Sequence, residues 1–159
     1  MDVLIKQFLN VNLEGKELLK TIEKEYTALA SNFGYFPVQS ELFLCFKKAD
    51  SRIGVEVQFG GEKAILESLE KLVRSKSDIC ILLTSSKTPS PSLSWIRAML
   101  LKKFSIGNQK YIFFDIHTKR VLKVEQEIDK FFSELNRPEW ARPLPPPRPP
   151  IFKKRKKFV

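Results

Sequence analysis

The chain of 159 residues suits one domain with a moderate core, and a composition of 43% hydrophobic and 11% aromatic residues excludes wholesale disorder. There is no apolar run of about 18 residues and no cationic segment followed by an apolar one, so we expect neither a membrane span nor a secretory signal. The net charge of +10 favours a polyanionic partner over a neutral one.

The first predicted element is an amphipathic helix. Residues 1–11 are apolar-rich and fit a strand or a helical turn equally well. From Asn12, a candidate cap, apolar residues recur at helical spacing until Gly34 ends the pattern. Glu25 lies beside this apolar stripe, at i+3 from Ile22 and i−4 from Leu29, where the simplest interpretation is a solvated helical charge.

Residues 35–39 predict a short edge strand, and residues 41–61 predict two strands joined by a polar turn. Apolar residues alternate in both strands, so Glu56 and Gln58 must share the face opposite Val55 and Val57. If the turn is centred near residues 49–50, residue 43 lies opposite residue 56. Glu41, which opens the first of the two strands, is then a diagonal neighbour of Glu56. Two long carboxylates at such positions can converge on one cation.

The remaining elements alternate between helices and buried strands. The patterns predict a helix at residues 62–75, a buried strand at 78–84, a helix after the Ser/Pro-rich loop 85–92, a buried strand at 110–116 and a helix at 121–135. Ser90 is the predicted cap of the helix after the loop, with Pro91 in its first turn. This order predicts an α/β fold with a mixed sheet and helices on both faces.

Two cysteines, Cys45 and Cys80, occur within strand patterns and are interpreted as buried free thiols, which fits a reducing cytoplasm. The sequence has no glycine-rich phosphate loop, no cluster of Cys and His, and no histidine other than His117. Histidine-based triads and zinc hydrolases are therefore not expected, and the acids near the hairpin remain as the candidate chemistry.

The last segment, residues 137–159, differs from the domain of residues 1–136. It carries eight Lys or Arg and one acid, a net charge of +7, whereas residues 1–136 carry only +3. Seven of the ten prolines lie in residues 138–150, which is typical of an extended arm. The residues expected to bind nucleic acid, DNA ahead of RNA, are Arg142, Arg148, Lys153, Lys154, Arg155, Lys156 and Lys157.

The same tail has other interpretations. In a eukaryote its cations would serve as a nuclear-import address, and its prolines also suit the aromatic groove of a protein partner. A merely solvated tail is the third alternative. A membrane surface is not favoured, because the tail lacks an amphipathic helical pattern.

The hairpin resembles the signature of the PD-(D/E)xK nuclease superfamily, in which an acid is followed after about a dozen residues by E-V-K. Here the pattern is Glu41, fourteen residues, then Glu56-Val57-Gln58, and GVEVQFG is similar to the motif of restriction enzymes that carry Gln in place of Lys. The resemblance covers residues 13–115, with Glu in place of the usual Asp and Gln in place of the usual Lys. It implies a restriction-endonuclease-like αβββαβ core.

The resemblance also implies a site for Mg²⁺ or Mn²⁺ held by Glu41, Glu56 and the backbone carbonyl of Val57, with Gln58 orienting water. Glu25 would be the helical glutamate that faces the site in this family, with Glu23 less well placed. Lys63 would replace the missing cation from the helix that follows. The alternative is that Glu56 and Gln58 are polar residues on a solvent-exposed hairpin face.

The expected function is therefore Mg²⁺-dependent hydrolysis of DNA by a structure-directed or repair endonuclease, which would act as a homodimer to cut two strands. The alternative is a nuclease-derived fold that no longer cuts. It would serve as a nucleic-acid-binding or ribonucleoprotein component through its basic tail.

Overall fold

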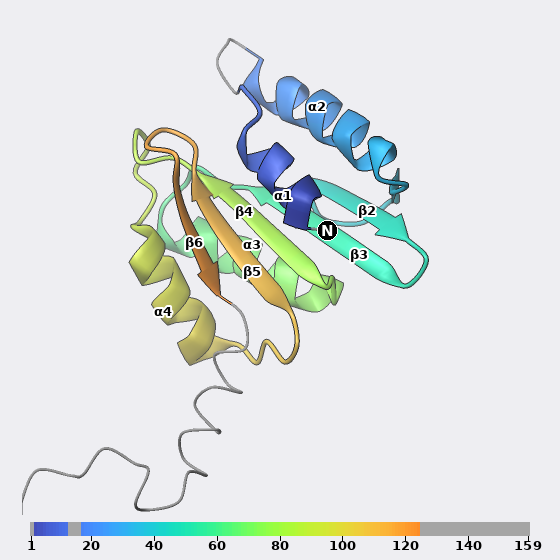
Figure 1. Ribbon diagram of the computed structural model, residues 1–159. Helices are drawn as coiled ribbons and strands as arrows, with labels where there is room; N and C mark the ends of the chain where they lie inside the picture. The colour runs from blue at the N-terminus through green and yellow to red at the C-terminus, as the bar shows by residue number, and fades with distance from the viewer. Residues whose placement is uncertain (1, 13–16, 125–159) are drawn as a thin grey trace, which may run out of the picture. The chain divides into compact units, whose positions relative to one another are not determined.

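The computed structural model describes residues 2–12 and 17–124, which form a mixed α/β fold with a six-stranded sheet and four helices (Figure 1). In chain order the elements are α1 (Asp2–Leu9), α2 (Leu18–Asn32), β1 (Phe36–Pro37), β2 (Leu44–Lys48), β3 (Ser51–Val57), α3 (Glu62–Ser75), β4 (Ile79–Thr84), α4 (Leu93–Lys103), β5 (Lys110–Asp115) and β6 (Arg120–Val124). Among these helices, none has the length and apolarity needed to cross a membrane.

The strands lie in the sheet in the order in which they occur in the chain. Short turns join β2 to β3 and β5 to β6, and these pairs are antiparallel, as is β1 with β2. The helical crossovers through α3 and α4 make β3, β4 and β5 parallel. The predicted mixed sheet is therefore confirmed.

The two faces of the sheet are covered by different helices (Figure 1). Helices α1 and α2 lie on one face, where Phe8 and Tyr26 stack with ring centroids 4.3 Å apart over a core that includes Ile53 and Val55 of β3. Helices α3 and α4 lie on the other face and bury Leu69 and Leu100, among others. Because side chains alternate along a strand, Gly54 and Glu56 point toward α3.

The hairpin register is the one that a turn centred near residues 49–50 predicts, with Leu44 paired to Val55. The turn between β2 and β3 contains Ala49 at a φ of 52°, a left-handed conformation that reverses the chain tightly. One detail of the prediction is wrong, because β2 begins at Leu44 and Glu41 precedes the strand rather than opening it. The buried free state of Cys45 and Cys80 is confirmed.

Three other local predictions need correction or completion. Residues 2–9, for which strand and helix were equally suitable, form helix α1. The cap of α4 is Ser92, whose Oγ accepts a hydrogen bond from the Trp95 backbone N–H at 3.2 Å, whereas the Ser90 hydroxyl donates to the Gly60 carbonyl. Two serines two residues apart offer the same capping chemistry, so composition alone selected the wrong one.

The helix predicted at residues 121–135 is wrong over its first four residues, which belong to β6. Lys119, at a φ of 63°, closes a tight turn after β5, and Val121 then pairs with Phe114 along the edge of the sheet. The i, i+3 spacing of Val121 and Val124 suits a helix, but β-branched residues after a tight turn suit a strand equally well. Residues 125–135 lie outside the described residues.

Gly54 allows a close approach between β3 and the segments that cover it. A Cβ atom at this position would lie 2.6 Å from Leu42 Cδ1 and 2.8 Å from Ser77 Oγ. Both distances are shorter than real contacts, so the absence of a side chain lets Leu42 and Ser77 close over the strand directly beside Glu56.

We expect Gly54→Ala to lower the free energy of unfolding by about 1–3 kcal/mol, the usual cost of overpacking a core. Gly61→Ala is the matched control, because a Cβ there meets nothing within 4 Å; we expect a loss below about 1 kcal/mol at this helix cap. Urea titration of both variants tests this, and equal losses would contradict the close-approach argument.

Candidate functional site

Glu56 lies one residue before the end of β3 and is buried, with 5% of its surface exposed. Its Oε1 accepts a hydrogen bond of 2.7 Å from the backbone N–H of Phe43, the residue that precedes β2. A buried carboxylate needs such donors, because its ionised form loses the hydration that it has in water. The residue that the sequence singled out is thus a buried acid held by the neighbouring strand segment.

A second partner comes from α3, where Lys71 Nζ lies 4.0 Å from Glu56 Oε2. The Lys71 side chain is 41% exposed, so it reaches from solvent toward a carboxylate that is almost fully covered. The sequence analysis did not identify Lys71. Buried Ser68, three residues earlier among the apolar residues of α3, marks the helix face that meets Glu56 and could have indicated Lys71.

Burial raises the pKa of Glu56 above the ordinary value of a glutamate. The hydrogen bond from Phe43 and the charge of Lys71 oppose this effect, and Glu41 adds to it through its negative charge. The carboxyl group is therefore easier to protonate in the folded protein than in the unfolded chain, which is a common property of both catalytic acids and structural buried acids.

Glu41 reaches the same helix but a different cation. Its Oε1 accepts a hydrogen bond from the Arg74 guanidinium, and both side chains are about half exposed. Arg74 also lies 3.5 Å from Glu70, one turn earlier in α3. Because Lys71 and Arg74 are neighbours at i, i+3 on α3, Glu41 and Glu56 are both brought to the α3 side of the sheet.

Gln58 follows β3 and lies on the same side as Glu56, as the alternation predicts. Its Nε2 donates to Ser68 Oγ at 3.2 Å, and its Oε1 accepts from the Gly60 backbone N–H at 2.9 Å. Ser68 also lowers the pKa of Glu56 through a hydrogen bond, so one α3 hydroxyl serves both residues of the motif. The amide thereby closes the turn that leads from β3 into α3.

The other predicted site residues lie apart from this cluster. Val57 packs against the apolar core on the α1 and α2 face, which leaves only its backbone for the role that the resemblance implies. Glu25 is exposed on α2 and lines a pocket of about 410 Å³ with Gln7 and Asn10, on the opposite side of the sheet from Glu56.

Lys63 is exposed in the first turn of α3. The predicted nucleic-acid-binding residues from 142 to 157 lie outside the described residues.

The donors match a hard divalent cation in kind, because Mg²⁺ prefers carboxylate oxygens and Glu41 and Glu56 lie on one side of the sheet. Arg74 and Lys71 are placed against the same two carboxylates. Metal binding therefore fits the chemistry of the donors but requires these two cations to move from the carboxylates or to share them.

The comparisons with known proteins are sparse. No protein-family model matches the sequence, and no curated protein matches it. A solved structure titled "CdiA-CT/CdiI toxin and immunity complex from Burkholderia pseudomallei" contains a similar chain, with 12% identity, coverage of 72% of this chain and 92% of that chain, and a TM-score of 0.37. A TM-score this low carries no argument about function.

Glu56→Gln should change the pH dependence of stability. A carboxyl group whose folded pKa is raised stabilises the fold below its unfolded pKa, near 4.5, and this contribution is lost as the pH rises through the folded pKa. Glutamine keeps an acceptor for the Phe43 N–H without the buried charge. We therefore expect Glu56→Gln to gain stability relative to the original protein as the pH rises from about 4 to 8.

Thermal unfolding at a series of pH values measures this difference. Glu67→Gln is the matched control, since Glu67 is exposed on α3, the helix that carries Lys71. If Glu56→Gln instead lost stability relative to the original as the pH rises, attraction to Lys71 would outweigh the cost of burial.

Proposed function

We propose that the protein acts on nucleic acid and that the cluster at the end of β3 is its site for metal-assisted phosphodiester hydrolysis. The observation that carries this proposal is the convergence of Glu56, Gln58 and Lys71 around Ser68, with Glu41 on the same side of the sheet. Two acids, an amide and a lysine are the residue types that the resemblance implies for this chemistry.

The arrangement of the elements supports the same proposal. The order α2, β1, β2, β3, α3, β4 follows the αβββαβ order expected of a restriction-endonuclease-like core. Of the two acids of the motif, Glu56 lies at the carboxyl end of β3 as expected, whereas Glu41 precedes β2 instead of opening it.

In this proposal each residue has a separate role. The carboxylates of Glu56 and Glu41 hold the divalent cation, with the backbone carbonyl of Val57 as a further ligand. When bound, the ion neutralises charge on the phosphate and makes hydroxide available. Lys71, rather than exposed Lys63, places an ammonium group beside Glu56, where it stabilises negative charge that develops on the phosphate.

One observation favours the second candidate, a nuclease-derived protein that binds nucleic acid without cutting it. Both glutamates already have cationic partners on α3, so their charges are balanced by side chains alone. Ion pairs of this kind also occur as purely structural features. Metal binding and cleavage therefore have to be measured separately.

The test compares cleavage of branched, nicked and single-stranded DNA and of RNA, with Mg²⁺ and with Mn²⁺. We expect Glu56→Gln to reduce cleavage by at least about a hundredfold, the usual cost of removing one preorganised catalytic group. No metal-dependent cleavage of any substrate by the original protein, with binding retained, would establish the non-catalytic candidate.

Two lysine variants test which lysine of α3 takes part in cleavage. Lys71→Met keeps most of the apolar stem, so we expect cleavage to fall about a hundredfold, whereas Lys63→Met on the same helix should leave it within about twofold. Calorimetric titration with Mn²⁺ measures metal binding, which does not depend on cleavage. Unchanged cleavage in Lys71→Met would show that Lys71 is only a partner of Glu56.

A further prediction concerns the tail. Deletion of residues 137–159 removes eight cations and one acid, so fewer counterions should be released when nucleic acid binds. We expect the slope of log Kd against log salt concentration to become flatter in the truncated protein, measured by fluorescence anisotropy. An unchanged slope would contradict a phosphate-binding role for the tail.

A further inference from the structure

The loop between β4 and α4, residues 85–92, meets the turn after β3 at the carboxyl edge of the sheet (Figure 1). Strands β3 and β4 are parallel, and the Gln58 backbone N–H still donates to the Leu83 carbonyl at 2.9 Å, one residue beyond the end of β3. The two chain segments therefore leave the sheet side by side, so a residue of the loop can reach the turn that begins at Gln58.

One hydrogen bond joins the loop to this turn. The Ser90 hydroxyl donates to the Gly60 carbonyl at 3.0 Å, although 30 positions separate the two residues along the chain. Thr88 Oγ1 lies 3.0 Å from Ser90 Oγ, but it donates to the Ser85 carbonyl at 2.6 Å. Because a hydroxyl group has a single hydrogen, the Thr88 hydrogen is used within the loop and the Ser90 hydrogen is left for Gly60.

Gly60 is held through both of its backbone polar groups. Its N–H donates to Gln58 Oε1 at 2.9 Å, and its carbonyl accepts the hydrogen of Ser90. A Cβ atom at this position would lie 2.8 Å from Ala64 Cβ and 3.0 Å from Gln58 Oε1, so the turn is packed tightly against the first turn of α3. The position of Gly60 thus fixes where the Gln58 amide oxygen can lie.

The Gln58 amide continues the connection to Glu56. Its Nε2 donates to Ser68 Oγ at 3.2 Å, and the Ser68 hydroxyl hydrogen-bonds to the Glu56 carboxylate. Ser68 and Glu56 are both buried, so the last of these bonds is shielded from water. A connected set of hydrogen bonds therefore leads to the acid from Ser90 through Gly60, Gln58 and Ser68.

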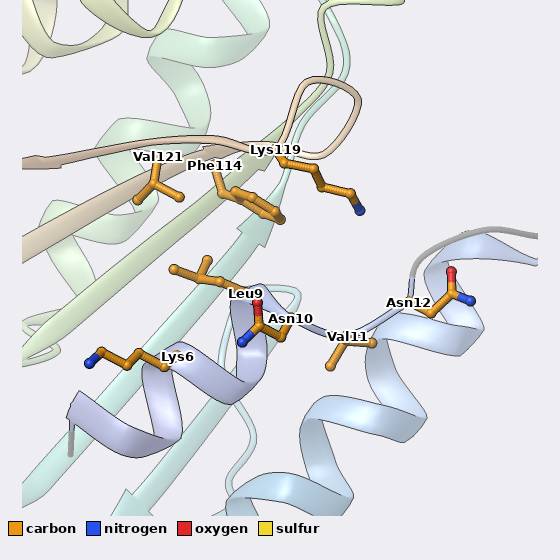
Figure 2. A pocket seen from close by; sticks show the side chains of 8 residues that line it. All are labelled: Lys6, Leu9, Asn10, Val11, Asn12, Phe114, Lys119 and Val121. Carbon is orange, nitrogen blue, oxygen red and sulfur yellow. The ribbon is translucent and has the colours of Figure 1, made fainter.

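The loop is itself anchored at both ends. Phe114 belongs to the core under α1 and lines a pocket on that side of the sheet (Figure 2), so Asp115, the next residue of β5, points to the side of α4. Asp115 Oδ1 accepts a hydrogen bond of 3.1 Å from the Ser86 backbone N–H, and at the other end of the loop Ser92 caps α4. Because the loop is fixed at both ends, it can in turn hold the turn after β3.

We propose that Ser90 is a positioning residue for the candidate site, because its hydrogen bond to Gly60 holds the turn after β3 and thereby keeps the Gln58 amide in one orientation. Its effect on cleavage and on metal binding rests on the proposed function, whereas its effect on Gln58 does not. Loss of this hydroxyl, which lies outside the motif, should therefore disturb the motif.

The experiment compares three variants of the full chain. Ser90→Ala removes the hydroxyl, Ser90→Thr keeps it, and Ser94→Ala makes the same serine-to-alanine change at an exposed position in the first turn of α4. The first readout is hydrogen exchange of the Gly60 backbone N–H, followed by NMR. We expect this exchange to be about two- to tenfold faster in Ser90→Ala, which corresponds to the net worth of one hydrogen bond, and unchanged in the other two variants.

The second readout is Mn²⁺ affinity, measured by calorimetric titration, together with kcat and KM for cleavage. Because Gln58 and Ser68 support a proposed metal ligand, we expect Ser90→Ala to weaken Mn²⁺ binding about tenfold and to lower kcat about tenfold, with KM within about twofold. Ser90→Thr should restore both. In a Gln58→Met background, Ser90→Ala should weaken Mn²⁺ binding no further, since its effect passes through Gln58.

Circular dichroism and thermal unfolding establish that all variants are folded. Unchanged exchange of the Gly60 N–H in Ser90→Ala would overturn the proposal, as would a loss that Ser90→Thr does not restore or that Ser94→Ala shares. An equal additional loss in the Gln58→Met background would also overturn it, because the connection would then bypass Gln58. If the original protein neither binds Mn²⁺ nor cuts, the proposed function fails, but the exchange readout still decides whether Ser90 holds the turn.

Discussion

The burial of both faces of β3 is the constraint on which the rest of the structure depends. Ile53 and Val55 pack under α1 and α2, so strand alternation sends Glu56 under α3, where water is excluded. A carboxylate in that position is costly unless it is hydrogen-bonded and paired. The Phe43 N–H and Lys71 supply these partners, and the same partners determine whether the cluster can do chemistry.

The cations on α3 have two possible roles that follow from one geometry. A lysine beside a buried glutamate stabilises the folded protein only modestly, because both charges lose hydration. In the proposed function, the same lysine stabilises charge that develops on a bound phosphate. Arg74 differs, since it holds exposed Glu41 at the surface, where solvent weakens the pair and exchange for another cation costs little.

The sequence by itself determined the hairpin, its register, the buried central strands and the shared face of Glu56 and Gln58, because alternation and turn chemistry are local properties. Tertiary structure alone decided that Lys71 reaches Glu56, that Glu25 lies across the sheet from it, and that Val121 joins an edge strand. These outcomes depend on how α2 and α3 dock and how the last strand pairs, which are contacts between residues far apart in the chain. Because such contacts are not local, the sequence analysis named the candidate residues but not their partners.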